Sequence, residues 1–265
     1  MVAKILVDQL DNLRRAVIRC KKCPRLVRWR ELAAKKPPLR YRGQSYWAKP
    51  LPGFGDPAAR LLIVGLAPAA NGGNRTGRIF TGDRSGDWLY GTLHAFGFSN
   101  QPTSVHRGDG LTLKDCYICA AVRCAPPDNK PLPREFDRCR PYLVRELQLL
   151  KEVRVVVALG KIAFDSFLKS HQENGGTIPK PRPQFAHGSV ARLGPSTRPP
   201  AMDRGHSLGI PPGSRGTVLS EQSESKDNGV ILLGSYHPSQ QNTFTGRLTR
   251  EMFQAVFAKA RELIR

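Results

Sequence analysis

Four short apolar runs, each followed by a segment with helical periodicity, constrain the fold of this chain more than any other sequence feature. The apolar runs lie at 60–66, 116–123, 153–159 and 230–234. Helical spacing follows them at 84–97, 133–150, 160–169 and 248–264. Strands that alternate with helices indicate a mainly parallel sheet with helices on both faces. We therefore expect residues 1–265 to form a single α/β/α sandwich around a four-stranded, mainly parallel sheet.

Three other segments have distinct compositions. Residues 2–19 repeat apolar residues at helical spacing and predict an amphipathic helix that leads into Cys20. Residues 24–55 are rich in arginine, proline and aromatic residues without a clear period, which predicts an ordered loop across the surface. Residues 189–229 are rich in proline, glycine, serine and arginine, and their few large apolar side chains predict a flexible insertion.

Pro141 lies within the predicted helix 133–150 and predicts a kink or split in that helix.

The loops after the strands are expected to carry the functional site. The carboxyl ends of parallel strands meet at one edge of a sheet, and ligands bind beyond that edge. The sequence places the loops 67–83, 124–132 and 235–247 there.

The net charge of +21 indicates a polyanionic partner. Lys and Arg number 42 against 21 Asp and Glu, and they are spread along the chain. Such an excess repels itself unless a polyanion relieves it, so nucleic acid is the leading partner, with a basic proteome as the alternative. The sequence has no apolar run long enough for a transmembrane helix and no signal-peptide pattern at its start. We therefore expect a cytoplasmic protein without a membrane partner.

The cysteines fall into pairs that are typical of a metal site. Cys20 and Cys23 form C-x2-C, and Cys124 and Cys139 form C-x14-C. Four thiolates from two distant segments suit a [4Fe–4S] cluster or a four-cysteine zinc site, and spacing alone does not choose between them. A rival C-x2-C pair at 116–119 lies in a predicted strand, where side chains three positions apart point to opposite faces, so we interpret it as buried and apolar.

Several longer motifs, in the right order, resemble the family 5 (type b) uracil-DNA glycosylases. They are the run from Cys20 to Leu26, the runs 65–68 and 74–83, the segment 121–130, and the run from His237 to Thr249. The resemblance covers residues 15–188 and 230–265 and departs from the family pattern at Ala69, where the family usually has glycine. It implies a DNA-repair hydrolase that flips uracil out of DNA and cuts its bond to the sugar. Hypoxanthine and other deaminated or modified bases are implied as further substrates.

The resemblance also implies a cofactor and partners. It assigns a [4Fe–4S] cluster to Cys20, Cys23, Cys124 and Cys139. We expect a monomer that acts on double-stranded DNA, with single-stranded DNA as a second substrate, and that associates with the nucleoid while it acts. The motif runs at 65–68, 74–83 and 237–249 contain no lysine that could form a Schiff base with the sugar, so strand-cleaving lyase activity is not expected. The alternative function is a non-catalytic or DNA-crosslinking protein on the same fold.

Two residues are candidates for catalysis. Cleavage of the glycosidic bond leaves positive charge on the sugar and negative charge on the departing base. His237 follows the fourth strand and is the candidate donor to the leaving base, with a capping or core histidine as the alternative. Asp83 is the candidate that positions water or stabilises the sugar cation, and its alternative role as a helix N-cap is compatible with this. Related branches carry a polar activator where this chain has Leu66, which directs attention to Asp83.

Further residues are candidates for binding. Phe80 is expected to stack on the flipped base, or else to be a core aromatic. Asn129 has an amide that suits the edge of uracil, or else occupies a turn. Ala67, in the turn after the first strand, is expected to touch the base. The candidate DNA contacts, some of which have helix capping as their alternative role, are Asn74, Arg75, Arg78, Thr243 and Arg247.

Overall fold

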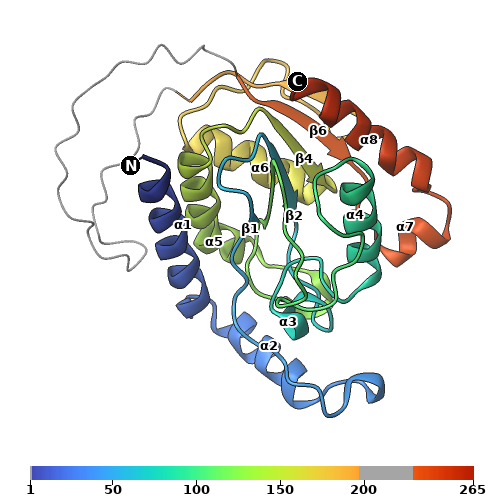
Figure 1. The fold of residues 1–265 in the computed structure, drawn as a ribbon. Helices are drawn as coiled ribbons and strands as arrows, with labels where there is room; N and C mark the ends of the chain where they lie inside the picture. The colour runs from blue at the N-terminus through green and yellow to red at the C-terminus, as the bar shows by residue number, and fades with distance from the viewer. Residues whose placement is uncertain (1, 197–228) are drawn as a thin grey trace.

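A six-stranded sheet lies between two layers of helices in the computed structural model, which describes residues 2–196 and 229–265 (Figure 1). In chain order the strands are β1 (Phe54–Gly55), β2 (Leu61–Gly65), β3 (Cys116–Ala120), β4 (Val155–Leu159), β5 (Val190–Arg192) and β6 (Ile231–Ser235). The spatial order is β1-β3-β2-β4-β6-β5. The four predicted strands form the parallel centre, and β1 and β5 pair antiparallel at the edges.

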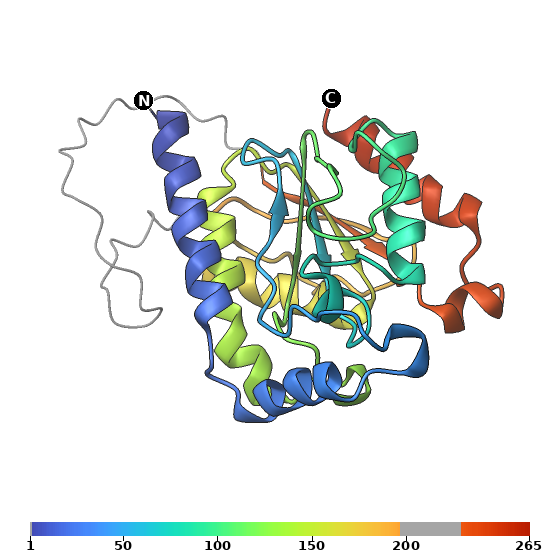
Figure 2. The ribbon, with the colours of Figure 1, turned by 60° about the horizontal axis from the view of Figure 1, so that its bottom comes forward.

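Helices cover both faces of the sheet, as the alternation of elements predicts. On one face lie α1 (Val2–Arg19), α5 (Pro133–Leu149) and α6 (Lys161–Glu173), and on the other lie α4 (Arg84–Ala95) and α8 (Arg250–Leu263) (Figures 1 and 2). Within β2, Ile63 packs in the core on the α4 and α8 side, whereas Val64 packs on the α1, α5 and α6 side. Every residue of β2, β3 and β4 is buried, because a sheet covered on both faces has no solvent side.

The prediction of an irregular loop over residues 24–55 is wrong in its first third. Residues Pro24–Lys35 form helix α2, with Pro24 in the first turn, where proline needs no amide partner. The buried face of α2 consists of Leu26 and Arg30, which are four positions apart. Apolar periodicity does not predict this helix, because one of its two buried residues is an arginine. The rest of the segment contains the single 3-10 turn Leu39–Tyr41 and the short strand β1.

Two other predictions need correction. Helix α5 continues through Pro141 without a split, since Cys139, Tyr142 and Leu143 on either side of it are buried against the rest of the protein. Most of the predicted insertion, 197–228, lies outside the described residues. Its first residues, however, form β5, which pairs with β6 through backbone hydrogen bonds, so residues 190–192 belong to the sheet. A three-residue edge strand with two exposed members has no apolar pattern by which to recognise it.

The remaining short helices lie at the carboxyl ends of the parallel strands. They are α3 (Gly73–Thr76), the 3-10 turn Pro127–Asn129 and α7 (Gln240–Phe244). Among the described helices, none is long and apolar enough to cross a membrane.

A buried ion pair ties the sheet to α5. Nη1 of Arg123, just after β3, donates to Oε1 of Glu146 at 3.1 Å, and Nη2 donates to Oε2. Both side chains are about 2% exposed. Removing one member of a buried pair leaves the other as an uncompensated charge, which is far more costly than the loss of an exposed pair.

We predict that Glu146→Ala lowers the free energy of unfolding by about 3–5 kcal/mol. Glu262→Ala, which breaks the exposed Lys259–Glu262 pair, is the matched control and should cost less than about 1 kcal/mol. Urea denaturation measures both. A double variant with Arg123→Met and Glu146→Leu should be closer to the parent, because it leaves no unpaired charge. Equal stabilities of the two single variants would contradict this account of the pair.

Candidate active site

A cavity of about 700 Å³ lies where the central strands end. The loops after β2, β4 and β6 and the turn that contains Asn129 all reach it, which confirms that they converge on one edge of the sheet. Its lining residues are Leu66–Ala69, Ile79, Phe80, Asp83–Ser85, Asn129, Leu159–Ala163, His237 and Ser239–Gln241. The predicted catalytic and base-binding residues Asp83, His237, Phe80, Asn129 and Ala67 are therefore brought together.

Phe80 forms an aromatic wall of the cavity and is held in a demanding conformation. Its φ of 52° lies in the left-handed region, which costs a residue with a side chain about 1 kcal/mol or more. A side-chain carbon on Gly65, the last residue of β2, would lie 2.8 Å from the ring of Phe80. The ring therefore lies directly over the end of the strand, in space that only glycine leaves free.

Asp83 lies on the wall of the cavity and also has the N-cap position given above as its alternative role. It is the N-cap of α4, and its Oδ1 accepts a hydrogen bond from the amide of Gly86 at 3.0 Å. A side-chain carbon on Gly72 would lie 2.1 Å from Oδ2, so the backbone of the preceding loop closes over the carboxylate. Burial raises the pKa of Asp83 above its ordinary value, and the hydrogen bond from Gly86 opposes that shift. The side chain is thus fixed in place at the cavity wall.

His237 faces Phe80 across the cavity. The two rings are 5.9 Å apart between centroids and are tilted by 32°. The side-chain Nδ2 of Asn242 donates to the carbonyl of His237 at 2.9 Å, which fixes the backbone of this loop. Burial lowers the pKa of His237 to about 4, so the imidazole is neutral at neutral pH. A neutral ring has one N–H to donate, and no described residue accepts a hydrogen bond from it.

Asn129 and Ala67 occupy different positions in the cavity. Asn129 is exposed and stands at the rim, where its φ of 55° follows the left-handed φ of 53° at Asp128. Asparagine and aspartate adopt this conformation more readily than other residues with side chains, which explains both residue types in this turn. Ala67 is half-buried in the loop after β2, beside Leu66, whose carbonyl accepts from the amide of Val122 at 2.9 Å.

Two of the predicted DNA contacts are inside the protein. Asn74 is fully buried, and its Nδ2 donates to the carbonyl of Arg30 at 3.1 Å. Arg78 is 5% exposed and pairs with Asp109, with Nη2 and Oδ2 2.6 Å apart. Their prediction as phosphate contacts is therefore not compatible with the structure, because neither side chain reaches the surface. Both instead stabilise the loop that carries Phe80 and Asp83.

Arg75 is partly exposed but has most of its donors engaged. Its guanidinium donates to the carbonyls of Asn71 at 2.8 Å and Gly82 at 2.9 Å, and to Oε1 of Gln44 at 2.9 Å. It also lies 4.3 Å from the ring centre of Tyr41. Arg75 therefore joins the two ends of the loop that precedes Asp83.

The loop after β6 provides the more accessible cation. Arg247 is exposed, has no carboxylate partner among the described residues, and lies over the ring of Tyr236 at 4.7 Å. Thr243 is half-buried, and its hydroxyl donates to the carbonyl of Gln240 at 3.3 Å within α7. Nearby, the guanidinium of Arg84 lies 4.2 Å from the ring centre of Phe244, which is 67% exposed.

The four cysteines expected to bind a cluster lie on the α1, α5 and α6 side of the sheet. Cys124 and Cys139 are buried, Cys20 and Cys23 are half-buried, and all four belong to the same packed region. A thiolate at Cys20 would be close enough to raise the pKa of each of the other three thiols. In the described part of the chain, no three His, Cys, Asp or Glu side chains are arranged to hold a single metal ion.

The surroundings of the cysteines fit a negatively charged group. Arg30 of α2 is 3% exposed, and its Nη1 donates to Sγ of Cys124 at 3.1 Å. No ion pair joins Arg30 to a carboxylate among the described residues, and its Nε is buried without a partner. A buried cation is stable only when an anion compensates it, and a set of thiolates around a cluster would do so.

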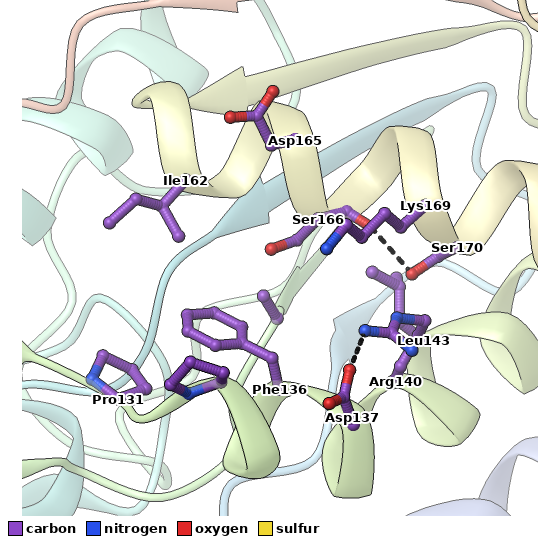
Figure 3. Close-up of a pocket in the computed structure, with 12 residues that line it drawn as sticks. Pro131, Phe136, Asp137, Arg140, Leu143, Ile162, Asp165, Ser166, Lys169 and Ser170 are labelled. Atoms are coloured by element: carbon purple, nitrogen blue, oxygen red, sulfur yellow. Dashed lines mark hydrogen bonds and ion pairs between the residues drawn. The ribbon is translucent and has the colours of Figure 1, made fainter.

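A second cavity of about 310 Å³ opens between α5 and α6 (Figure 3). Phe136 and Ile162 lie on its two sides, and the other end is occupied by Arg140, which pairs with Asp137 (Figure 3). It is lined by none of the predicted site residues. It shares only Ile162 with the larger cavity. The larger cavity therefore remains the candidate active site.

Sequence reasoning missed Gly72, Gly65 and Arg30. Gly65 begins one of the motifs and Gly72 lies between two of them, but the reason for each glycine is a contact with Phe80 or Asp83 that only the folded loop creates. Arg30 was hidden because α2 was not recognised, although its spacing from Leu26 is a helical signal.

Comparison with known proteins agrees with this geometry. The family model described as the uracil DNA glycosylase superfamily matches residues 52–261. A type-5 uracil-DNA glycosylase of Thermus thermophilus is 46% identical over 244 residues, which cover 92% of this chain and 93% of the relative. The type-5 enzyme of Mycobacterium tuberculosis is 44% identical over 245 residues, covering 92% and 78%. That of Pyrobaculum aerophilum is 39% identical over 250 residues, covering 94% and 91%. The chain therefore belongs to the uracil-DNA glycosylase superfamily, as one of its type-5 members.

Proposed function

We propose that the chain is a monofunctional glycosylase that flips uracil out of DNA into the 700 Å³ cavity and hydrolyses its bond to deoxyribose. The observation that carries this proposal is the presence of Phe80, Asp83 and His237 on the walls of one cavity at the carboxyl edge of the sheet. A base inside a duplex cannot be reached by these side chains, so it has to leave the stack first.

The walls of the cavity suit a flat base with polar edges. Phe80 offers a ring for stacking, and the amide of Asn129 at the rim offers both a donor and an acceptor. The cavity is also roomy enough for a purine, so we propose that hypoxanthine and other modified bases are further substrates.

His237 is proposed to stabilise the departing base. As the glycosidic bond breaks, the electron pair moves to the base, and negative charge grows on its ring nitrogen and carbonyl oxygens. The neutral imidazole of His237 donates its N–H to that charge, and it need not transfer a proton. A donor already fixed in a cavity stabilises the transition state without reorganisation, which is the main source of its effect.

Asp83 is proposed to act at the sugar. Its carboxylate carries charge opposite to that of the developing sugar cation, and it accepts a hydrogen bond from the water that attacks this carbon. The water gives its oxygen to the sugar carbon, and one of its protons is released as the hydroxyl forms. The N-cap hydrogen bond from Gly86 holds Oδ1 in place, and Oδ2 lies beside Gly72.

DNA is bound by the basic surface around the cavity. Arg247 and Arg84 are exposed near the mouth, and neither pairs with a carboxylate among the described residues. We propose that they contact phosphates, that duplex DNA is the main substrate, and that one chain acts alone.

We further propose a [4Fe–4S] cluster on Cys20, Cys23, Cys124 and Cys139. The buried, carboxylate-free guanidinium of Arg30 beside Cys124 supports an anionic group here. A bound cluster would supply a crosslink between the α1–α2 junction and α5, and the chemistry at the cavity needs no electron from it.

The central test uses a labelled duplex that contains one uracil. The parent enzyme should yield a strand break only after alkali, because a monofunctional glycosylase leaves an abasic site. His237→Ala and Asp83→Asn should each slow single-turnover excision by on the order of 100- to 1000-fold. Both should bind the duplex about as tightly as the parent, since they act on charge that exists only in the transition state.

Arg247→Ala is the contrasting variant in the same assay. It should weaken duplex binding and reduce the salt dependence of the dissociation constant, because one phosphate contact is lost. At saturating enzyme its excision rate should be close to that of the parent. Intact DNA at enzyme excess would refute the glycosylase proposal, and a covalent protein–DNA adduct would indicate the crosslinking alternative.

The two shifted pKa values predict the pH dependence of excision. Burial raises the pKa of Asp83, so its charge is lost, as pH falls, at a higher pH than for an exposed aspartate. Burial lowers the pKa of His237 to about 4, so this ring does not change charge between about pH 6 and 8. Single-turnover rates should therefore be level in that range and fall on the acid side. The acid fall should persist in His237→Ala and disappear in Asp83→Asn. A decrease in rate as pH rises through about 6.5, abolished by His237→Ala, would show instead that a charged imidazole is required.

The cluster proposal predicts a coloured protein. Protein purified without air should absorb broadly in the visible and contain about four irons per chain. Serine at any one of Cys20, Cys23, Cys124 or Cys139 should lower both quantities, whereas Cys119→Ser should not, because Cys119 lies within β3 and is not one of the four proposed ligands. One zinc and no iron would contradict the cluster while keeping the four-cysteine site.

A further inference from the structure

Arg30 is a buried cation with an unusual set of partners. Its side chain is 3% exposed, and within 2–196 and 229–265 it makes one hydrogen bond, from Nη1 to Sγ of Cys124 at 3.1 Å. No carboxylate of the described residues forms an ion pair with it, and its Nε has no partner. A guanidinium that is removed from water needs a nearby negative charge, and a neutral thiol does not supply one.

Arg123, the other buried guanidinium near the cysteines, has a different partner. Its charge is compensated by Glu146, although it also acts on Cys139, whose Sγ accepts from the backbone amide of Arg123 at 3.3 Å. The exposed Arg138 lies beside Cys23. Among the described residues, Arg30 is therefore the buried arginine beside these cysteines that has no carboxylate partner.

The backbone of Arg30 holds the loop that leads to the active site. Its carbonyl accepts from Nδ2 of Asn74 at 3.1 Å, and Asn74 is fully buried. The carbonyl of Asn74 accepts from the amide of Ala48 at 3.0 Å, so both ends of this residue are fixed. Asn74 is two positions after Gly72, whose backbone closes over Oδ2 of Asp83.

We propose that Arg30 is a positioning residue that couples the cysteine cluster to the catalytic loop. Its guanidinium compensates the thiolates and donates to Cys124, and its carbonyl fixes Asn74 and thereby the loop over Asp83. This inference rests on the cluster of the proposed function. Excision then depends on an intact cluster, although the cluster takes no part in the chemistry. When the cluster is lost, Arg30 loses its counter-charge and α2 shifts. The loop over Asp83 then no longer holds its carboxylate in position.

The variants separate the two ends of this connection. Arg30→Gln removes the charge, and Arg30→Lys keeps it with a shorter reach. Asn74→Leu keeps Arg30 but removes the hydrogen bond to its carbonyl, and it also removes the buried, unpaired Oδ1 of Asn74. Arg28→Gln is the matched control, because Arg28 is an exposed arginine on the same helix.

The readouts are the visible absorption of the cluster, its reduction potential, its half-time of loss in oxidant and chelator, and the single-turnover excision rate. Arg30→Gln should lose the cluster about tenfold faster than the parent, since a charge-assisted hydrogen bond is gone, and its potential should be more negative, because a nearby positive charge favours the added electron. Arg30→Lys should have a cluster lifetime and a reduction potential between those of Arg30→Gln and the parent. Arg28→Gln should match the parent in both. Asn74→Leu should keep a normal potential and cluster lifetime but excise more slowly, with little change in duplex affinity.

The outcomes distinguish this inference from the cluster proposal. Parent protein without iron or visible absorption would overturn both. A parent with a normal cluster, together with Arg30 variants of unchanged potential and lifetime, would overturn the role of Arg30 alone. If Arg30→Gln does not fold, Arg30→Lys decides by the same measurements. Excision by Asn74→Leu at the parent rate would overturn the coupling to the loop.

Discussion

The register of the parallel strands is the constraint on which the active site depends. Gly65 pairs with Ala120, and Leu159 pairs with Ser235, so β2, β3, β4 and β6 end at nearly the same level. The loops that follow must therefore turn within a few residues of one another. A shift of one residue would also move each strand's buried side chains to the opposite face, which the helices on both sides forbid. The packing that fixes the core thus also fixes where the strands end and where the loops that line the cavity begin.

How much of this could be predicted from the sequence differs between the core and the site. The central strands and the helices between them follow from apolar runs and helical spacing, because burial on two faces leaves a strong pattern. Helix α2 did not, since its buried face includes Arg30, and β5 did not, since an edge strand needs backbone bonds and no apolar residues. The motif residues Asp83 and His237 were identified and lie in one cavity, whereas Asn74 and Arg78 were taken for surface contacts. A sequence states which residues are polar, but only the fold decides whether a polar group faces DNA or another part of the protein.

The arginines illustrate the limit of charge as a guide. The excess of basic residues correctly indicates DNA, yet several of the arginines that lie within or beside the motifs are internal. Arg123 and Arg78 pair with carboxylates, and Arg30 faces a cysteine sulfur. Each uses its planar group of donors to join segments far apart in the chain, which lysine could not do in the same geometry. The arginines left for phosphate, such as Arg247, lie over aromatic rings at the surface, where the ring holds the side chain but leaves its donors free.

The cavity itself favours the neutral forms of its two catalytic groups. Burial lowers the pKa of His237 and raises that of Asp83, so both shifts work against charge in the empty site. A site of this kind gains most when new charges of both signs appear inside it, because charges are screened less in a buried site than in bulk water. Uracil and its sugar are neutral before the bond breaks and are oppositely charged as it breaks. In the proposed mechanism, the donor at His237 and the carboxylate at Asp83 would therefore interact weakly with the substrate and strongly with the transition state, which is the difference that accelerates a reaction.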